Sequence, residues 1–544
     1  MKTASMSIAI LVLVSISTAA AQSAADRALK VHRQKHAKLQ AEFERRVEEV
    51  AKWCEENELV DLATKTREMS ASPDPRTLGE ARLPQKVQRV IPAGAVGKQR
   101  TWYGKTSRIR TDYARELYRL SRTVLDRYPS YAMDLVREVA FHDPDNRNAR
   151  KILGYVQFKD KKRADESDYL GEWVTPFEAR MRGGLKRMVW SDKYGWVQES
   201  KLAKYEQGLR PSDPGSRRTS WISAEKDAQI HRDLRNPWKI ETEHFIVKTN
   251  HSLKRGVEIA KQLEEYYTFF RRTFASFFET PEQLRDRFIG AAGARRPKPP
   301  KQMLVQYYRT KEEYVSQLIK KIPQIADTEG LYYEPDRTAY FFDNPDRQND
   351  GTLFHEATHL FFDIPTVQNR RNAAQARRRA LQQRVVNPWI LGENENFWII
   401  EAIACYMESF ERTKDGYRLG NPNYIRFRGA HHRLMKDEFF VPLKKYSAMG
   451  IREFQSSTEI AKLYTQGSGL AHFLMHYENG KYRDALVRFI GELYRPNLQT
   501  PLKQPSLESA TGVSFAELGK QYKEYMQQLY EPKQAKAADS GSIE

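Results

Sequence analysis

Cysteine is almost absent from this chain of 544 residues, which contains only Cys54 and Cys405. The two lie far apart in the sequence, so a disulfide framework does not hold the protein together. Long apolar runs are also missing, because no segment beyond the first residues approaches the roughly 20 apolar residues that cross a bilayer. We therefore expect a mature chain without a transmembrane anchor.

The one clear apolar stretch lies at the N-terminus. Lys2 precedes an apolar run from Ile8 to Ile16, and the small residues Ala19 to Ala21 follow it. This is the pattern of a signal peptide, which we place at residues 1–21. The alternative is an N-terminal membrane anchor, for which the run is short. The sequence thus predicts export to the periplasm or the extracellular space.

Basic residues outnumber acidic ones, 90 to 70, and give a formal charge of +20. Such a charge attracts anionic partners. No nucleic-acid-binding motif with its required spacing occurs, so we expect no nucleic acid partner. Anionic polymers of the cell envelope are the predicted charged partners, and a plain contribution to solubility is the alternative.

Residues 22–160 show the helical period. Phe43, Val47 and Val50 are spaced as one buried helical face requires. A DPDN turn at residues 143–146 separates two further helical segments. The segments resemble a single degenerate tetratricopeptide-like hairpin, but no array of repeats accompanies it. An ordinary helical domain is the alternative interpretation.

Residues 161–236 contain a weak repeat built on tryptophan. Trp173, Trp196 and Trp221 each precede a β-branched residue and then a polar segment that is typical of a helix start. We expect a small module of short strands, each followed by a helical turn, with the tryptophans in its core. The functional alternative is an aromatic platform that binds a ligand such as a polysaccharide.

In residues 237–532, segments with the two-residue period of a strand alternate with segments that have the period of an amphipathic helix. Strand patterns at NPWKIETEHFIVKTN and at Met303 to Tyr307 are separated by a long amphipathic helix, and GLYYEPDRTAYFFDN is typical of a hairpin. This order predicts an α+β domain. The Ala/Ser/Lys-rich tail at residues 533–544 is expected to be disordered.

The segment TLFHEATHLFF at residues 352–362 carries the chemistry. His355 and His359 are four residues apart, so one helical face presents both imidazoles with Glu356 beside them. Zinc with two histidines needs a third protein ligand. Glu401 lies on the apolar segment ENFWIIEAIACYMESF, which we expect to be buried. A bound cation would explain a carboxylate at such a position.

HEATH, FWIIEAIACY and YTQGSGLAHFL together resemble the gluzincin clan of zinc metallopeptidases, which includes thermolysin and the aminopeptidase N family. The likeness is strongest to the peptidase-MA-like domains of exported bacterial proteins, and it covers about residues 238–530. It implies Zn²⁺ bound by His355, His359 and Glu401. It further implies Glu356 as general base, Tyr464 as the group that steadies the oxyanion, and a protein or peptide substrate.

Three features depart from that family. The gap between His359 and Glu401 is 41 residues long and carries the basic insert NRRNAAQARRRALQQR. This insert is either a lid or dock for an acidic substrate, or a solvated helix face. Ala402 replaces the usual glycine after the third ligand, which changes packing more than coordination. The Gly-Ala-Met-Glu-Asn segment of the aminopeptidases is absent, so aminopeptidase specificity is not implied.

Several other residues are candidates for supporting roles. Glu393, Glu395 and Glu408 flank Glu401 and are either partners of the ligands or alternative ligands. We interpret the remaining candidates as ordinary core or surface residues: His431, His432, His472, His476 and Cys405. Two other functions stay open, namely a zincin-fold scaffold with weak or no turnover that recognises envelope polymers or proteins, and a helical protein with a chance HExxH.

Overall fold

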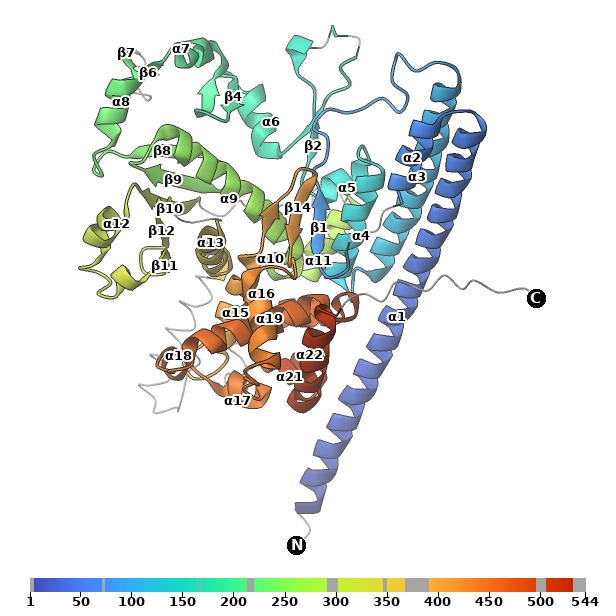
Figure 1. Cartoon of the computed structure of the whole chain (residues 1–544), viewed down its shortest axis with the longest axis vertical. Coiled ribbons are helices and arrows are strands. Elements are labelled where there is room, and N and C mark those ends of the chain that lie inside the picture. Colours follow the sequence, from blue (N-terminus) through green and yellow to red (C-terminus); the bar gives the residue numbers. More distant parts are fainter. Residues whose placement is uncertain are drawn as a thin grey trace.

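The computed structural model describes residues 4–70, 74–163, 165–166, 168–212, 220–290, 302–345, 350–366, 391–495 and 505–531, with side chains from residue 27 onward. Helices and a mixed sheet share the described chain, consistent with the predicted α+β class (Figure 1). The basic insert and the C-terminal tail lie outside the described residues, so the predictions about them stay predictions.

Helices form the N-terminal part of the molecule. They are α1 (Ala4–Glu56), α2 (Val60–Glu68), α3 (Gly97–Val124), α4 (Pro129–His142) and α5 (Arg147–Ile152). Phe43, Val47 and Val50 lie in their shared core, as the spacing predicts. The DPDN turn joins α4 to α5, where the Asn146 side chain caps α5 by accepting from the Ala149 N–H at 3.0 Å.

The long helix α1 runs along one side of the molecule (Figure 1). It passes through the predicted cleavage point at Ala21 without a break. Export and cleavage are untested by this and stay predictions. Within the described part of the chain, no helix combines the length and apolar character needed to cross a membrane.

Two strands lie within residues 22–160, which the sequence predicts to be helical: β1 (Leu78–Ala81) in the interior of that region and β2 (Val156–Phe158) at its end. Strand β1 pairs antiparallel with β14 (Gly416–Leu419), which also pairs with β13 (Glu411–Arg412). The segment Leu-Gly-Glu-Ala has no β-branched residue to reveal a strand. Its hydrogen-bond partner lies more than 300 residues away, so no local pattern indicates it.

Three consecutive hairpin–helix units follow. The first has β2 (Val156–Phe158), β3 (Glu172–Val174) and α6 (Pro176–Gly183); the second has β4 (Met188–Ser191), β5 (Gly195–Gln198) and α7 (Leu202–Glu206); the third has β6 (Leu209–Pro211), β7 (Trp221–Ser223) and α8 (Ala224–His231). Trp173, Trp196 and Trp221 each lie on the second strand of a unit, so the predicted strand-then-helix order is confirmed. Of these three tryptophans, only Trp173 is fully buried, so the predicted core position is wrong for Trp196 and Trp221, which are half-buried.

The largest sheet among the described residues has five strands, in the order β11-β12-β10-β9-β8. Its strands are β8 (Trp238–Glu241), β9 (Phe245–Thr249), β10 (Met303–Tyr308), β11 (Leu331–Tyr333) and β12 (Thr338–Phe342). The three central strands are parallel, while β8 and β11 pair antiparallel at the two edges. The predicted strand at Met303 to Tyr307 and the predicted hairpin are therefore confirmed, whereas NPWKIETEHFIVKTN forms two paired strands, β8 and β9, instead of the single strand expected.

The remaining helices complete the molecule. Those around the sheet are α9 (Leu253–Thr273), α10 (Ala275–Phe278), α11 (Pro281–Ile289), α12 (Lys311–Leu318) and α13 (Gly351–Asp363). The C-terminal ones are α15 (Phe397–Met407), α16 (Ile425–Met435), α17 (Leu443–Ala448), α18 (Ile451–Gln455), α19 (Ile460–Gly480), α20 (Arg483–Tyr494), α21 (Leu507–Thr511) and α22 (Phe515–Leu529). One hydrophobic core contains residues of the sheet, of α13 and α15, and of this C-terminal bundle.

Candidate metal centre

Helix α13 carries the two imidazoles of HEATH. His355 and His359 lie one turn apart, with ring centroids 5.0 Å from each other. The opposite side of the helix is apolar, and Phe354 and Phe361 are buried in the core. The hydroxyls of Tyr266 on α9 and Thr358 on α13 hydrogen-bond at 2.6 Å, which fixes the rotation of α13 about its axis. The histidine face therefore points toward α15.

Helix α15 brings the predicted third ligand to the same place. A Glu401 carboxylate oxygen lies 3.4 Å from Nε2 of His355 and 3.8 Å from Nε2 of His359. Within the described chain, these three residues form a group whose ligand atoms all lie within 4.8 Å of one another. The three side chains are 13 to 16% exposed, so the group is largely shielded from solvent.

This donor set fits a small divalent cation. Metal–ligand bonds of about 2.1 Å in a tetrahedral site separate neighbouring ligand atoms by about 3.4 Å. The two nitrogen–oxygen distances from Glu401, 3.4 and 3.8 Å, are close to that separation. Two imidazoles and one carboxylate also match the ligand chemistry of hydrolytic zinc sites, which leave a fourth position for water.

The protonation of His359 and Glu401 favours ligation. Burial lowers the pKa of His359 to about 4, so its imidazole is neutral and offers a lone pair near neutral pH. Burial works against the charged form of Glu401, but His359 and His355 together hold the pKa of that carboxyl below its usual value. A negative carboxylate beside a neutral imidazole is the state that a cation prefers.

The carboxylate of Glu408 orients His355. One of its oxygens lies 2.8 Å from Nδ1 of His355, at the far side of the ring from Glu401. Arg426 donates to both Glu408 oxygens at 2.8 and 2.9 Å, and Tyr424 donates to one at 3.0 Å. These contacts and the charge of His355 outweigh burial and lower the pKa of Glu408 to about 2. Burial lowers the pKa of His355, but hydrogen bonds to Cys405, Glu401 and Glu408 outweigh it and raise that pKa above its usual value. A cation would therefore displace the proton on Nε2, while the ionised Glu408 holds the other proton on Nδ1.

A second group of possible ligands consists of His355, Cys405 and Glu408. It is the poorer metal site for two reasons. The Glu408 oxygens already accept hydrogen bonds from Arg426, Tyr424 and His355. Burial raises the pKa of the Cys405 thiol, whereas a metal ligand must be the thiolate. Glu408 thus supports the first group rather than competing with it.

Glu356 lies beside the ligand group and is the candidate base. One of its oxygens is 3.9 Å from Nε2 of His355. The other accepts a hydrogen bond of 2.7 Å from the backbone N–H of Tyr332, on edge strand β11. Burial raises the pKa of Glu356 to about 7, with a further contribution from the charge of Glu401. A carboxyl group with that pKa can take up and return a proton near neutral pH.

Helix α19 brings Tyr464 to the site. A hydrogen bond from its hydroxyl is among the interactions that lower the pKa of Glu401. A methyl group on Gly467, one turn further along α19, would lie 3.2 Å from Cβ of Ala402 on α15. Gly467 therefore permits the close approach of α19 and α15. Ala402 lies at that contact, in agreement with the prediction that this residue affects packing more than coordination.

All five site residues that the sequence predicts lie together: His355, Glu356, His359, Glu401 and Tyr464. Glu393 and Glu395 belong to neither group that can hold a metal. His431 packs against Tyr530, and His432 is exposed. His472 and His476 are buried and hydrogen-bonded, to Gly420 and Tyr525 and to Tyr406 respectively. Three further groups belong to the site: Glu408, Arg426 and the Tyr332 N–H. The sequence indicated Glu408 among its candidates, but it did not indicate the other two.

A cavity of about 610 Å³ occurs elsewhere in the molecule, between the hairpin–helix units and α9. None of the five site residues lines it, so the two features are separate.

No protein-family model matches this chain, and no curated protein is similar to it.

Proposed function

We propose that this protein is an exported zinc-dependent peptidase of the gluzincin type, whose catalytic domain spans about residues 237–532. The observation that carries the proposal is the convergence of two imidazoles and a carboxylate, with a second carboxylate of raised pKa beside them. His355, His359 and Glu401 would hold the ion. A bound zinc ion lowers the pKa of a water molecule and polarises a carbonyl group.

Glu356 and Tyr464 have complementary roles in this proposal. Glu356 accepts the proton of the attacking water and later delivers it to the leaving amine, which its pKa of about 7 favours. Tyr464 keeps its proton near neutral pH, because burial and the charge of Glu401 raise its pKa. Its hydroxyl can therefore donate to the oxygen on which charge develops.

The sheet edge offers a place for the substrate. Strand β11 is the outermost strand next to α13, and the N–H of Tyr332 already contacts Glu356. An extended peptide that pairs with this edge would pass close to the base. A protein or peptide substrate therefore fits the site better than a compact small molecule.

The substitution Glu356→Gln tests the function. With zinc supplied, the chain without residues 1–21 should cleave an unstructured protein such as casein. Glu356→Gln should retain zinc and lose at least about 100-fold in rate, because it removes the base and no ligand. Glu453→Gln, an exposed control on α18, should keep full activity. Zinc binding with no cleavage by the unaltered chain would instead support a scaffold with a zincin fold.

A further inference from the structure

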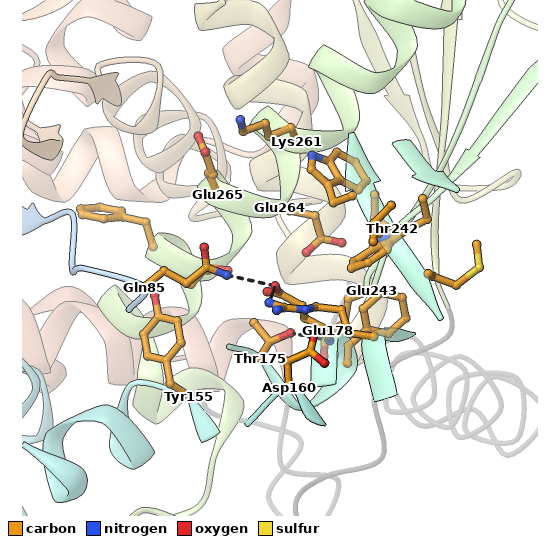
Figure 2. A pocket seen from close by; sticks show the side chains of 18 of the residues that line it. Gln85, Tyr155, Asp160, Thr175, Glu178, Thr242, Glu243, Lys261, Glu264 and Glu265 are labelled. Atoms are coloured by element: carbon orange, nitrogen blue, oxygen red, sulfur yellow. Dashed lines mark hydrogen bonds and ion pairs between the residues drawn. The ribbon is translucent and has the colours of Figure 1, made fainter. Parts of the chain in front are cut away.

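The cavity beside the hairpin–helix units has the size of a ligand site. Its volume, about 610 Å³, falls within the range of small-molecule pockets. One wall comes from α6, β4 and β5, and the other from α9 and the turn between β8 and β9. Figure 2 shows Glu178, Glu243 and Glu264 around the same space, although they come from different elements.

Three aromatic side chains line the cavity on the side of the hairpin–helix units. Trp196 packs edge-on against Phe177 at 5.9 Å and against Trp190 at 5.7 Å. Both tryptophans are only half-buried. Trp173 and Trp221 do not line the cavity. Of the three tryptophans in the sequence repeat, only Trp196 therefore contributes to a ligand-sized space.

The cavity is acidic within a basic protein. Seven carboxylates and four basic side chains line it. Each basic group already has an acidic partner: Arg182 has Glu178, Arg187 has Asp160, Arg272 has Glu80, and Lys261 has Asp192. A ligand with a negative charge would therefore have to compete with existing ion pairs. Most of the carboxylates are paired as well, some with basic groups outside the lining such as Arg137, Lys162 and Arg412, so the charge available to a cation is that of Glu243.

Glu243 is the carboxylate without a basic partner. Among the described residues, no basic side chain forms an ion pair with it, and its ionised form is favoured only by the more distant charges of His244 and Arg180 and by the Thr175 hydroxyl. Glu264, which also lines the cavity, adds a like charge and accepts from the His244 N–H at 2.6 Å. Burial and the charge of Glu264 raise the pKa of Glu243. A cation between the two carboxylates would relieve this repulsion.

We propose that this cavity binds an organic cation, an ammonium or guanidinium group on an apolar stem, with Glu243 as its charge partner and Trp196 as its aromatic contact. Carboxylates neutralise the charge, and aromatic faces attract a cation while they pack against an apolar stem. The group can come from a lysine or arginine side chain of a peptide, or from a free diamine. This site is independent of the metal centre.

Calorimetric titration of the chain without residues 1–21 tests the proposal. The probes are N-acetyl-lysine methylamide, N-acetyl-arginine methylamide, the free diamine cadaverine and the neutral sugar maltotriose. At least one cation should bind to a single site, and maltotriose should not. Tighter binding of the amino-acid derivatives identifies a peptide side chain as the ligand, and tighter binding of cadaverine identifies a free amine.

Two substitutions and two controls make the result specific. Glu243→Gln and Trp196→Leu should each raise the Kd of the bound cation about tenfold, which is the effect of losing one charge-assisted or cation–aromatic contact. Glu206→Gln, an exposed glutamate in the same units, should leave the Kd unchanged. Glu356→Gln should also leave it unchanged, which separates this proposal from the peptidase function.

Thermal melting confirms that each variant is folded, and either substitution alone suffices if the other does not fold. Failure of all three cations to bind would overturn the proposal. So would cation binding that neither substitution weakens, or binding of maltotriose in place of the cations.

Discussion

At the scale of single residues, the candidate site depends on a carboxylate outside the His355, His359 and Glu401 group. Glu408 binds the Nδ1 proton of His355 and so orients the ring, and Arg426 in turn fixes Glu408. Without this chain of hydrogen bonds, His355 could rotate or ligate through the wrong nitrogen. The sequence offered Glu408 only as one of three candidate glutamates, because its partner His355 lies 53 residues away.

The substitution Glu408→Gln tests this orienting role. Zinc affinity should fall about 10- to 100-fold, because the ring loses its charged partner while all three ligands remain. Competition with a chromophoric chelator measures the affinity. Glu411→Gln, on β13 and paired with Arg418 at the surface, is the control and should bind zinc normally. Equal affinity of all three proteins would show that Glu408 has no part in the site.

At the scale of secondary-structure elements, the contact between α15 and α19 positions Glu401 against Tyr464. A methyl group on Gly467 would lie 2.8 Å from the Tyr446 hydroxyl as well as close to Ala402. Tyr446 is fully buried and donates to the Leu463 carbonyl at 2.7 Å, so it cannot move without losing that hydrogen bond. Gly467 is therefore part of what holds the two helices together.

Gly467→Ala should thus destabilise the protein by about 1–3 kcal/mol through overpacking. Urea unfolding measures the change. The matched control is Gly104→Ala on α3, where the added methyl group meets nothing within 4 Å. That change should be neutral or stabilise by up to about 1 kcal/mol, since alanine favours the helix. A loss of stability at Gly104 equal to that at Gly467 would refute the packing argument.

Local patterns in the sequence predict the elements better than their contacts. The helix with His355 and His359, the strand–helix order at each repeated tryptophan, and the hairpin of β11 and β12 all follow from periodicity and turn residues. Strand β1 does not, because its pairing with β14 depends on a remote segment. Likewise, the pairing of β11 at the edge of the sheet places the N–H of Tyr332 against Glu356. No sequence pattern indicates such a backbone contact.

At the scale of the whole molecule, a buried ion cluster joins the N-terminal helices to the sheet. Glu80 on β1 accepts from Arg137 on α4 at 2.9 Å and also pairs with Arg272 on α9. The three side chains are only 5 to 6% exposed. Because α9 packs against α13, the cluster links the N-terminal helices to the element that carries His355 and His359.

Glu80→Gln should therefore lower the free energy of unfolding by about 3–5 kcal/mol, because buried Arg272 loses its charge partner and buried Arg137 loses one of its two, keeping Asp134. Urea unfolding is again the measurement. Glu49→Gln, which removes one partner of an exposed pair with Arg45, should change stability by less than about 1 kcal/mol. Similar small changes in both variants would mean that the cluster does not hold the two parts of the molecule together.

The most direct test of the central claim is the zinc content of the purified chain, measured by elemental analysis beside Glu401→Gln and Glu395→Gln. We predict about one zinc ion per chain in the unaltered protein and in Glu395→Gln, since Glu395 belongs to no ligand group. Glu401→Gln should lose most of its zinc, because a neutral amide replaces the carboxylate ligand. Absence of zinc from the unaltered protein, or its full retention in Glu401→Gln, would contradict the proposed metal centre.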